Sequence, residues 1–418
     1  MALNLQRARH IDNWGGFAIA CLLYVWSRAR SLLGGPAQPR LRATTPPAQE
    51  APRLRPSRVL AIKFYGLGNI VMLLPVLGAL RRAYPDVEID FLTSAENQTL
   101  LERSGTANRV IPVELTNVRT LISSLWRSIR TVRSRKYDLV IDFEQFVKLS
   151  PLIAFLTGAP HRIGFNTDGQ KRGWLYTIRV VYTDSEHMSR IFMRLLRPLG
   201  VDPEPVPPSI VTKPEEDGRV ETLLSGHAIG RDHSPLIAVH VGSGPNFYKI
   251  PLKRWPVDHF ARLCDGLVEG SGAAIVFTGK GEEERELIRS VMDQMKSRAV
   301  NACDELGIME LVALLKRCHL TVANDTSVMH LSAAVRTPVV AFFGPTAPVH
   351  YGPGNPEDMV FYRDLYCSPC LTNYNLKVSR CADPVCIRTI SPEEVVKSIQ
   401  QRFFSSGARL RGSLGGGA

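Results

Sequence analysis

The sequence predicts an α/β protein of two domains, each built on a parallel β-sheet. From residue 58 onward, short apolar runs alternate with amphipathic segments, as in parallel strands joined by helices. Residues 197–218 interrupt this alternation with prolines and charges, and the pattern then restarts. At 418 residues the chain is also too long for one hydrophobic core. We therefore expect two Rossmann-like domains that face a cleft.

The charge of the chain is concentrated at its N-terminus. The formal net charge is +12, and residues 1–58 hold nine arginines against Asp12 and Glu50, which gives 9 − 2 = +7. The remaining 360 residues are only mildly basic. This distribution argues against a nucleic-acid groove in the folded body.

Residues 1–57 form a separate segment in this interpretation. Residues 14–26 are apolar and carry Trp14 and Trp26, and arginines follow them. The run is shorter than the roughly 20 residues that span a bilayer. Aromatic and basic residues suit an anionic membrane interface, so we expect membrane association, with packing on the body as the alternative. Residues 34–56 are proline-rich and predict a flexible linker.

The first domain is expected over residues 58–205. Its predicted strands are residues 58–64, 87–93 and 137–144. Between the first strand and a helix with an apolar stripe lies a glycine turn that contains Gly66, Gly68 and Asn69. Such turns usually hold a phosphate or a reacting group, yet the amide of Asn69 neither gives nor takes a proton at neutral pH.

The second domain is expected over residues 206–418. Its predicted strands are residues 235–244, 273–281, 319–326 and 337–345. Near the C-terminus, Ser391 is the expected N-cap of a helix, with Pro392 in its first turn and Glu394 at the capping-box position. Ligands of such sheets bind at the carboxyl ends of the strands.

Two stretches of the second domain suit an anionic ligand. Asp325, Thr326 and Ser327 lead from a buried strand into a helix, where free amides and the helix dipole favour phosphate. An ordinary N-cap is the alternative. Lys253 and Arg254 lie on a loop after another strand and could neutralise a diphosphate, or form a solvated basic turn.

A third stretch of the second domain offers acids. Glu282 and Glu283 follow a glycine-containing strand end, where either could accept hydrogen bonds from ribose hydroxyls. Acids favoured by a helix N-terminus are the alternative explanation.

In this order and spacing, the stretches at residues 62–85, 253–256, 324–346 and 367–370 resemble glycosyltransferase family 9, the bacterial heptosyltransferase-like enzymes of lipopolysaccharide assembly. The resemblance covers about residues 58–404. It implies the two-domain GT-B fold, transfer without a metal cofactor, and a nucleotide-activated heptose such as ADP-heptose. It also implies that the C-terminal half holds the donor and the N-terminal half the acceptor.

The resemblance assigns roles to several of these residues. Lys253 would meet the diphosphate, and Glu282 or Glu283 the nucleoside. Asp325, Thr326 and Ser327 would hold the phosphates, although the family more usually has a glycine where Ser327 stands. His330, one turn further along, would face the donor or be satisfied within the domain interface.

The acceptor side departs from the family at Asn69. The family typically has an acid there, as candidate general base, and an amide can only orient the acceptor hydroxyl. Glu144, near the carboxyl end of its strand, is our substitute base, while Asp142 is expected to make a cap or ion pair within the domain. Arg162 and the polar loop after it, which contains Lys171 and Arg172, would contact the acceptor, or form a plain surface loop.

Four cysteines cluster near the C-terminus, in a loop over residues 367–386. They have the spacing C-x2-C-x10-C-x4-C, which in a reducing compartment suits structural zinc better than disulfides. Reduced, uncoordinated thiols are the alternative. The four are Cys367, Cys370, Cys381 and Cys386.

The sequence therefore predicts an inverting, metal-independent glycosyltransferase. Its expected partners are a nucleotide-sugar donor, a glycolipid or lipopolysaccharide-type acceptor and the cytoplasmic face of the inner membrane. A second hypothesis is a sugar-nucleotide-binding protein that has lost transfer activity, motivated by Asn69 and Ser327. A nicotinamide dehydrogenase is disfavoured, because Val71 stands where the dinucleotide loop needs its third glycine.

Overall fold

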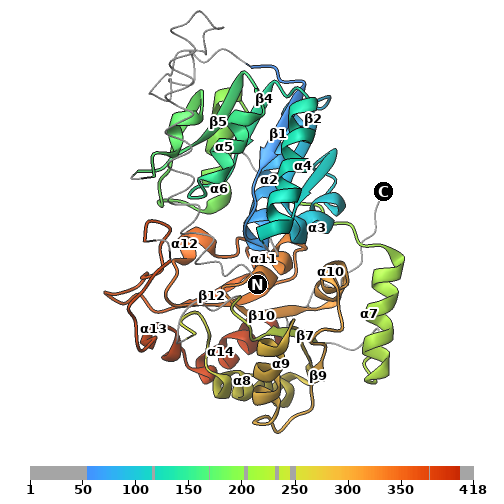
Figure 1. The fold of residues 1–418 in the computed structure, drawn as a ribbon. Helices are drawn as coiled ribbons and strands as arrows, with labels where there is room; N and C mark the ends of the chain where they lie inside the picture. The colour runs from blue at the N-terminus through green and yellow to red at the C-terminus, as the bar shows by residue number, and fades with distance from the viewer. Residues whose placement is uncertain are drawn as a thin grey trace, which may run out of the picture. The chain divides into compact units, whose positions relative to one another are not determined.

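Figure 1 shows a computed structural model of the protein, which describes residues 54–114, 118–168, 170–201, 206–230, 235–244, 251–375 and 377–404. The chain divides into two compact units, Met1–Pro208 (unit 1) and Ser209–Ala418 (unit 2). Each unit contains a six-stranded sheet whose strand pairs are all parallel. The predicted pair of parallel α/β domains is thus confirmed. The predicted membrane segment lies outside the described residues, and none of the described helices is long and apolar enough to span a bilayer.

The sheet of unit 1 has the strand order β3-β2-β1-β4-β5-β6. Its strands are β1 Arg58–Ile62, β2 Glu88–Ser94, β3 Arg109–Val113, β4 Leu139–Asp142, β5 His161–Asn166 and β6 Ile178–Val181. Three of them were not predicted, because β3 contains a proline, β5 carries an arginine and a glycine, and the edge strand β6 is mostly not buried. Their apolar signals are therefore weak.

Helices cover both faces of this sheet. The helices of unit 1 are α2 Leu67–Ala83, α3 Gln98–Arg103, α4 Val118–Ser134, α5 Leu149–Leu156 and α6 Met188–Met193, with 3₁₀ turns η1 Ala95–Asn97, η2 Arg172–Leu175 and η3 Arg194–Leu199. On one face, α4 and α5 contribute Val132 and Ile153 to a core with Leu60 and Ile62. On the other face, α2 packs against α6. This placement follows from right-handed crossovers, since the chain reverses direction across the sheet after β3.

The sheet of unit 2 has the strand order β12-β11-β10-β7-β8-β9. Its strands are β7 Leu236–His240, β8 Ala274–Phe277, β9 Val300–Asn301, β10 Leu320–Asn324, β11 Val339–Phe343 and β12 Met359–Tyr362. Its helices are α7 Pro214–Gly226, α8 Val257–Ser271, α9 Glu282–Met292, α10 Ile308–Arg317, α11 Ser327–Ala334, α12 Pro348–Tyr351, α13 Val385–Arg388 and α14 Pro392–Ile399, followed by η4 Gln400–Phe404. The predicted Ser391 cap is confirmed, since its hydroxyl accepts a hydrogen bond from the Glu394 amide.

The core of unit 2 is organised around Trp255. The indole is fully buried and stacks on Phe342, with ring centroids 4.1 Å apart. Its Nε1 donates to the carbonyl of Ile390 at 3.0 Å, so both the apolar and the polar parts of the ring are satisfied. Trp255 thereby fixes the end of the loop that carries Lys253 and Arg254.

Each sheet has one point where the chain reverses its direction of winding, and the strands that flank it are β1 and β4 in unit 1, and β7 and β10 in unit 2. In unit 1, Ile62 pairs with Asp142 at the carboxyl ends of these strands. In unit 2, Ala323 pairs with His240. Open α/β sheets bind ligands at such switch points, so these two edges are the expected places for a functional site.

Candidate functional site

The glycine turn of unit 1 starts directly after β1 and leads into α2. Gly66 is the N-cap of α2 and has φ 87°, a backbone region that favours glycine. A Cβ at Gly66 would stand 2.8 Å from Asn69 Nδ2, so the Asn69 side chain lies directly over this glycine. Gly68 lies in the first turn of the helix. The three predicted residues therefore form one compact turn at the switch point of unit 1.

Glu144 lies at the same edge but is fully engaged. Its Oε1 accepts hydrogen bonds from the amides of Phe64 (2.7 Å) and Tyr65 (3.1 Å). Its Oε2 accepts one from Lys63 Nζ at 2.8 Å, and both side chains of this ion pair are buried. The Glu144 side chain is only 3% exposed, so its carboxylate is held inside unit 1 in this structure. We infer from these contacts that Glu144 braces the glycine turn, and its role as the substitute base stays a prediction.

A second buried network, around Asp142 at the end of β4, holds the backbone of Glu144 in place. Asp142 accepts hydrogen bonds from Arg172 Nη2 at 3.1 Å, from the Tyr176 hydroxyl, and from the Glu144 amide at 2.9 Å. Burial raises the pKa of Tyr176 well above its usual value, so the phenol remains a donor. The prediction that Asp142 forms an ion pair within its domain is confirmed. The Arg172 side chain, which was expected to contact the acceptor, is buried and donates hydrogen bonds within this network.

Arg162 does not reach the carboxyl edge. It is the second residue of β5, it is buried, and its guanidinium donates to the carbonyls of Leu175, at 3.0 Å, and Ala159. Burial lowers its pKa to about 10. In this structure Arg162 ties β5 to the loops that flank it, and its contact with an acceptor stays a prediction.

In unit 2, one asparagine joins three segments at the switch point. Asn324, the last residue of β10, donates from Nδ2 to the carbonyls of Val241 and Gly242, both at 3.0 Å. Its Oδ1 accepts a hydrogen bond from the Trp255 amide at 3.0 Å. The end of β10, the loop after β7 and the Lys253 loop are thus held together by one buried side chain.

The adjacent Asp325 gathers cationic groups around it. Lys253 Nζ lies 2.7 Å from Asp325 Oδ2, and the Thr346 hydroxyl donates to the same oxygen at 2.8 Å. Burial opposes the ionisation of Asp325, but Lys253, Lys377 and His330 favour the anion, and its pKa lies below its usual value. The structure therefore brings together Lys253, Asp325 and His330 as the sequence had grouped them.

The start of α11 offers open hydrogen-bonding groups. Thr326 is the N-cap residue, but its side chain makes no capping hydrogen bond. Its Oγ1 is buried and has no hydrogen-bond partner among the described residues. Ser327 follows as the first helical residue and is half-buried. A buried hydroxyl without a partner beside free helix amides and a lysine suits an anionic ligand such as phosphate.

The acids at the start of α9 divide into three environments. Glu282 is 69% exposed and pairs with Arg285, so it points away from the strand ends. Glu283 pairs with Arg254, at 2.8 Å from Nη2 to Oε1. Glu284, which was not among the predicted site residues, has an oxygen 3.6 Å from His240 Nε2 and accepts a hydrogen bond from the Lys280 amide at 2.8 Å. Of the three, Glu284 approaches the switch point most closely.

A sequence signal for Glu284 did exist. Ile288 and Val291, four and seven residues further along α9, are its buried residues. Glu284 therefore lies on the inward stripe of the helix, and Glu282 and Glu283 do not. His240, the last residue of β7, was also passed over, although a polar residue at the end of a buried strand marks the carboxyl edge.

The cysteine cluster does not form a metal centre in this structure. Among the described residues, no group of three or more histidine, cysteine or acidic side chains lies close enough to hold a metal ion. All four thiols are free, and burial raises the pKa of Cys386 to about 11. The predicted structural zinc is thus unsupported.

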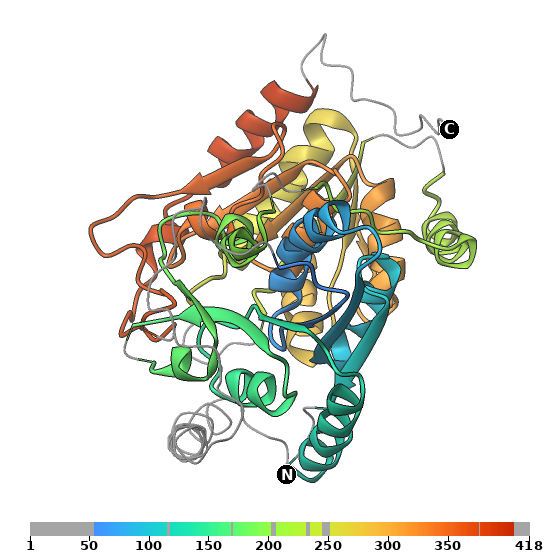
Figure 2. The same ribbon diagram turned by 90° about the horizontal axis from the view of Figure 1, so that it is seen from above.

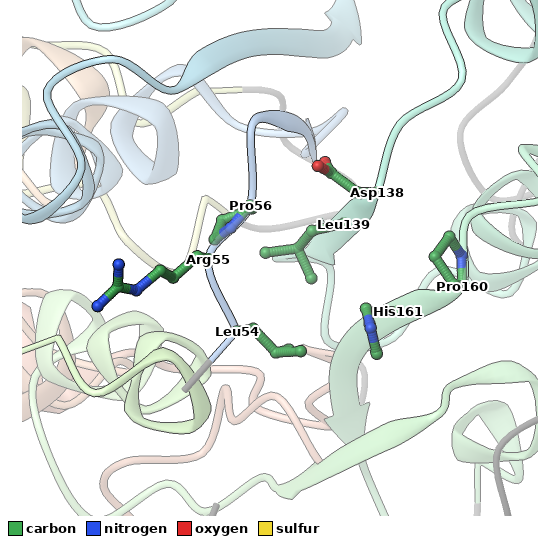
Figure 3. A pocket seen from close by; sticks show the side chains of 7 residues that line it. All are labelled: Leu54, Arg55, Pro56, Asp138, Leu139, Pro160 and His161. Carbon is green, nitrogen blue, oxygen red and sulfur yellow. The ribbon is translucent and has the colours of Figure 1, made fainter. Parts of the chain in front are cut away.

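A pocket of about 280 Å³ lies at the opposite, amino edge of the unit 1 sheet. Figure 3 shows its lining, which includes Arg55, Asp138 and His161. The Asp138 carboxylate accepts hydrogen bonds from the amides of Ser57 and Arg58, both at 2.8 Å, and so serves to anchor the start of β1. This pocket is remote from the switch-point residues of unit 1 and contributes none of them.

Residues 125–378 match the model of glycosyltransferase family 9 (heptosyltransferase). The chain belongs to glycosyltransferase family 9. A curated relative, lipopolysaccharide heptosyltransferase 2 of Salmonella typhimurium, is 27% identical over 301 residues, covering 70% of this chain and 84% of the relative.

Solved structures agree with the assignment of the chain to glycosyltransferase family 9. The glycosyl transferase family 9 structure from Veillonella parvula has a TM-score of 0.72 and 25% identity, covering 85% of this chain and 99% of that one. The Escherichia coli ADP-heptose lps heptosyltransferase II has a TM-score of 0.64 at 21% identity, covering 82% and 98%, and shares the fold. The protein is a glycosyltransferase, and the expected family is confirmed.

Proposed function

We propose that this glycosyltransferase moves a heptose or a related sugar from a nucleotide-diphosphate donor of the ADP-heptose kind to a lipopolysaccharide-type acceptor. The names of its relatives support both the sugar and the acceptor. The observation in this chain that carries the proposal is the unpartnered Thr326 hydroxyl at the start of α11, next to Asp325 and its partner Lys253. Since such an acceptor is a membrane glycolipid, we expect the enzyme to work at the cytoplasmic face of the inner membrane.

The donor site in this proposal is the switch-point edge of unit 2. The amides of α11 and the Thr326 hydroxyl would hold phosphate oxygens, and Lys253 would exchange Asp325 for the diphosphate. Glu284, at the ends of β7 and β8, suits the ribose hydroxyls better than the exposed Glu282. Arg254, held by Glu283, supplies further positive charge at this edge.

The acceptor site in this proposal is the glycine turn of unit 1. The acceptor oxygen attacks the anomeric carbon, the bond from that carbon to the phosphate oxygen breaks, and the electron pair leaves on the nucleoside diphosphate. Attack opposite to the leaving group inverts the configuration. Asn69 orients the attacking hydroxyl, whose proton passes to water or to the departing phosphate. Cations around the diphosphate stabilise the charge that develops there.

Asn69 also favours a second candidate function. A family member without an acid at this position could bind sugar nucleotides and transfer nothing. General base catalysis typically contributes a factor of roughly 100 to 10,000, so its loss can leave very little turnover. Transfer assays distinguish the two candidates, because donor binding is common to both.

The test begins with mass-spectrometric screening of the purified protein against nucleotide sugars. For each donor that binds, we expect Lys253→Ala to weaken affinity by about tenfold or more, because a charge-assisted contact to phosphate is lost. Lys296→Ala removes an exposed charge elsewhere in unit 2 and should have no effect. Unchanged affinity of Lys253→Ala in calorimetry for every donor would refute the donor site.

A further inference from the structure

Helix α4 of unit 1 presents an exposed stripe that mixes large apolar and basic side chains. Ile122 is 62% exposed and Trp126 is 59% exposed, which is unusual for apolar residues of this size. Arg119, Arg130 and Arg133 are also exposed. The five positions are separated by three, four, four and three residues, so they lie along one face of the helix. The opposite face is buried through residues such as Ser124 and Val132.

The charge around this stripe has one sign. Residues 115–137 contain Arg119, Arg127, Arg130, Arg133, Arg135 and Lys136 and no aspartate or glutamate. Arg135 is paired with Glu88 and Asp90. The four arginines of α4 itself have no carboxylate partner in the part of the chain that the structure describes, and the Arg130 guanidinium lies 5.2 Å above the Trp126 ring. Internal ion pairing therefore does not account for these arginines.

The position of α4 connects this stripe to the acceptor edge. The helix follows β3, and the Ser124 hydroxyl accepts a hydrogen bond from the Glu114 amide, directly after that strand, at 3.1 Å. The turn that carries Arg119 and Ile122 therefore lies at the carboxyl edge of the sheet, the same edge as the glycine turn. In Figure 2 the teal α4 stands at the outer margin of unit 1.

We propose that α4 docks unit 1 onto the surface of an anionic lipid bilayer. Trp126 and Ile122 enter the headgroup region, and the three arginines of the stripe, Arg119, Arg130 and Arg133, meet the lipid phosphates. This surface belongs to unit 1 and is distinct from residues 14–26. The docking proposal does not depend on the identity of the sugar or on whether transfer occurs. Donor binding can therefore be normal while the docking proposal fails.

The test uses the full chain in vesicle flotation, with phosphatidylcholine alone and with added phosphatidylglycerol. The variants are Trp126→Ser and the pair Arg119→Gln with Arg133→Gln. We expect each to lower the partition onto anionic vesicles by about tenfold or more, and salt to weaken binding of the parent. The pair Arg298→Gln with Arg336→Gln removes equal charge at exposed positions of unit 2 and should change nothing.

Fluorescence gives a second, local measurement. The spectrum of Trp126 is taken as the difference between the parent and Trp126→Phe, and it should shift to the blue and be quenched by brominated lipids. Equal flotation of parent, α4 variants and control would overturn the inference. A Trp126 spectrum that changes when residues 1–33 are deleted, with no vesicles present, would also overturn the inference. An oligomer that dissociates on Trp126→Ser would do the same. In either case the protein itself, and not a bilayer, would cover the stripe.

Discussion

Asn69 limits the chemistry that the glycine turn can perform. Its side chain lies over Gly66, in the first turn of α2, but it cannot bind the proton of an acceptor hydroxyl. We expect Asn69→Asp to raise turnover by about tenfold or more, because a carboxylate there adds base catalysis. Initial rates with a donor that the parent demonstrably binds check this. Asn69→Ala serves as control and should not gain activity. If neither the parent nor Asn69→Asp transfers sugar, the binding-only function is favoured.

Glu144 is the residue whose expected role changes most. If Glu144 were the general base, its substitution would lower the turnover of the enzyme and leave the stability of the protein unaltered. Because Glu144 is the buried partner of Lys63, we instead expect Glu144→Gln to destabilise the protein by about 3 kcal/mol, through the unpaired lysine that remains. Denaturant unfolding measures this. Glu96→Gln, at an exposed position close to the same edge, provides the comparison and should be nearly neutral. A Glu144→Gln protein of unchanged stability and lost turnover would support the role of general base instead.

At the scale of elements, the β1–α2 turn depends on a glycine with two constraints. Gly66 has positive φ, and a side chain there would also collide with Asn69. Gly66→Ala should therefore displace Asn69 and lower turnover by about tenfold or more, beyond the roughly 1 kcal/mol of backbone strain. Gly105 also has positive φ but open space around it, so Gly105→Ala shows the strain alone. Equal stability losses with unequal activity losses are expected from thermal unfolding and rate measurements.

At the scale of the whole molecule, buried His240 makes folding depend on pH. Burial lowers its pKa below 6.5, although Glu284 opposes this, and its Nδ1 donates to the Thr278 carbonyl at 3.0 Å. As pH falls below 6.5, the unfolded chain therefore binds a proton that the folded chain does not. Stability is full above this value and decreases below it, by at most about 1.4 kcal/mol per pH unit.

Melting temperatures across this pH range test the assignment. His240→Asn keeps a donor near the Nδ1 position and should flatten the dependence between about pH 7 and about pH 5. His227→Asn, at an exposed position on unit 2, should leave the dependence as it is in the parent. A His240→Asn variant whose melting temperature depends on pH as steeply as that of the parent would show that His240 does not titrate with folding.

The sequence by itself determined the features that depend on neighbours along the chain. Strand ends, helix starts and glycine turns are local, so the alternation predicted the parallel sheets, and Asp325 to Ser327 and the Lys253 loop were located at a carboxyl edge. The family followed from the same stretches. The Ser391 cap was likewise predictable, because its partner lies three residues away.

Only the tertiary structure decided what each buried polar group pairs with. Glu144 meets Lys63 across 81 residues, and Asp142 meets Arg172 across 30. These pairings give a predicted base and a predicted acceptor residue supporting roles, because a buried charge must find an opposite charge or donor wherever the fold provides one. Helix phase decided the rest: Glu284 faces inward and Glu282 faces water, although the two are only two residues apart, since a helix rotates about 100° with each residue.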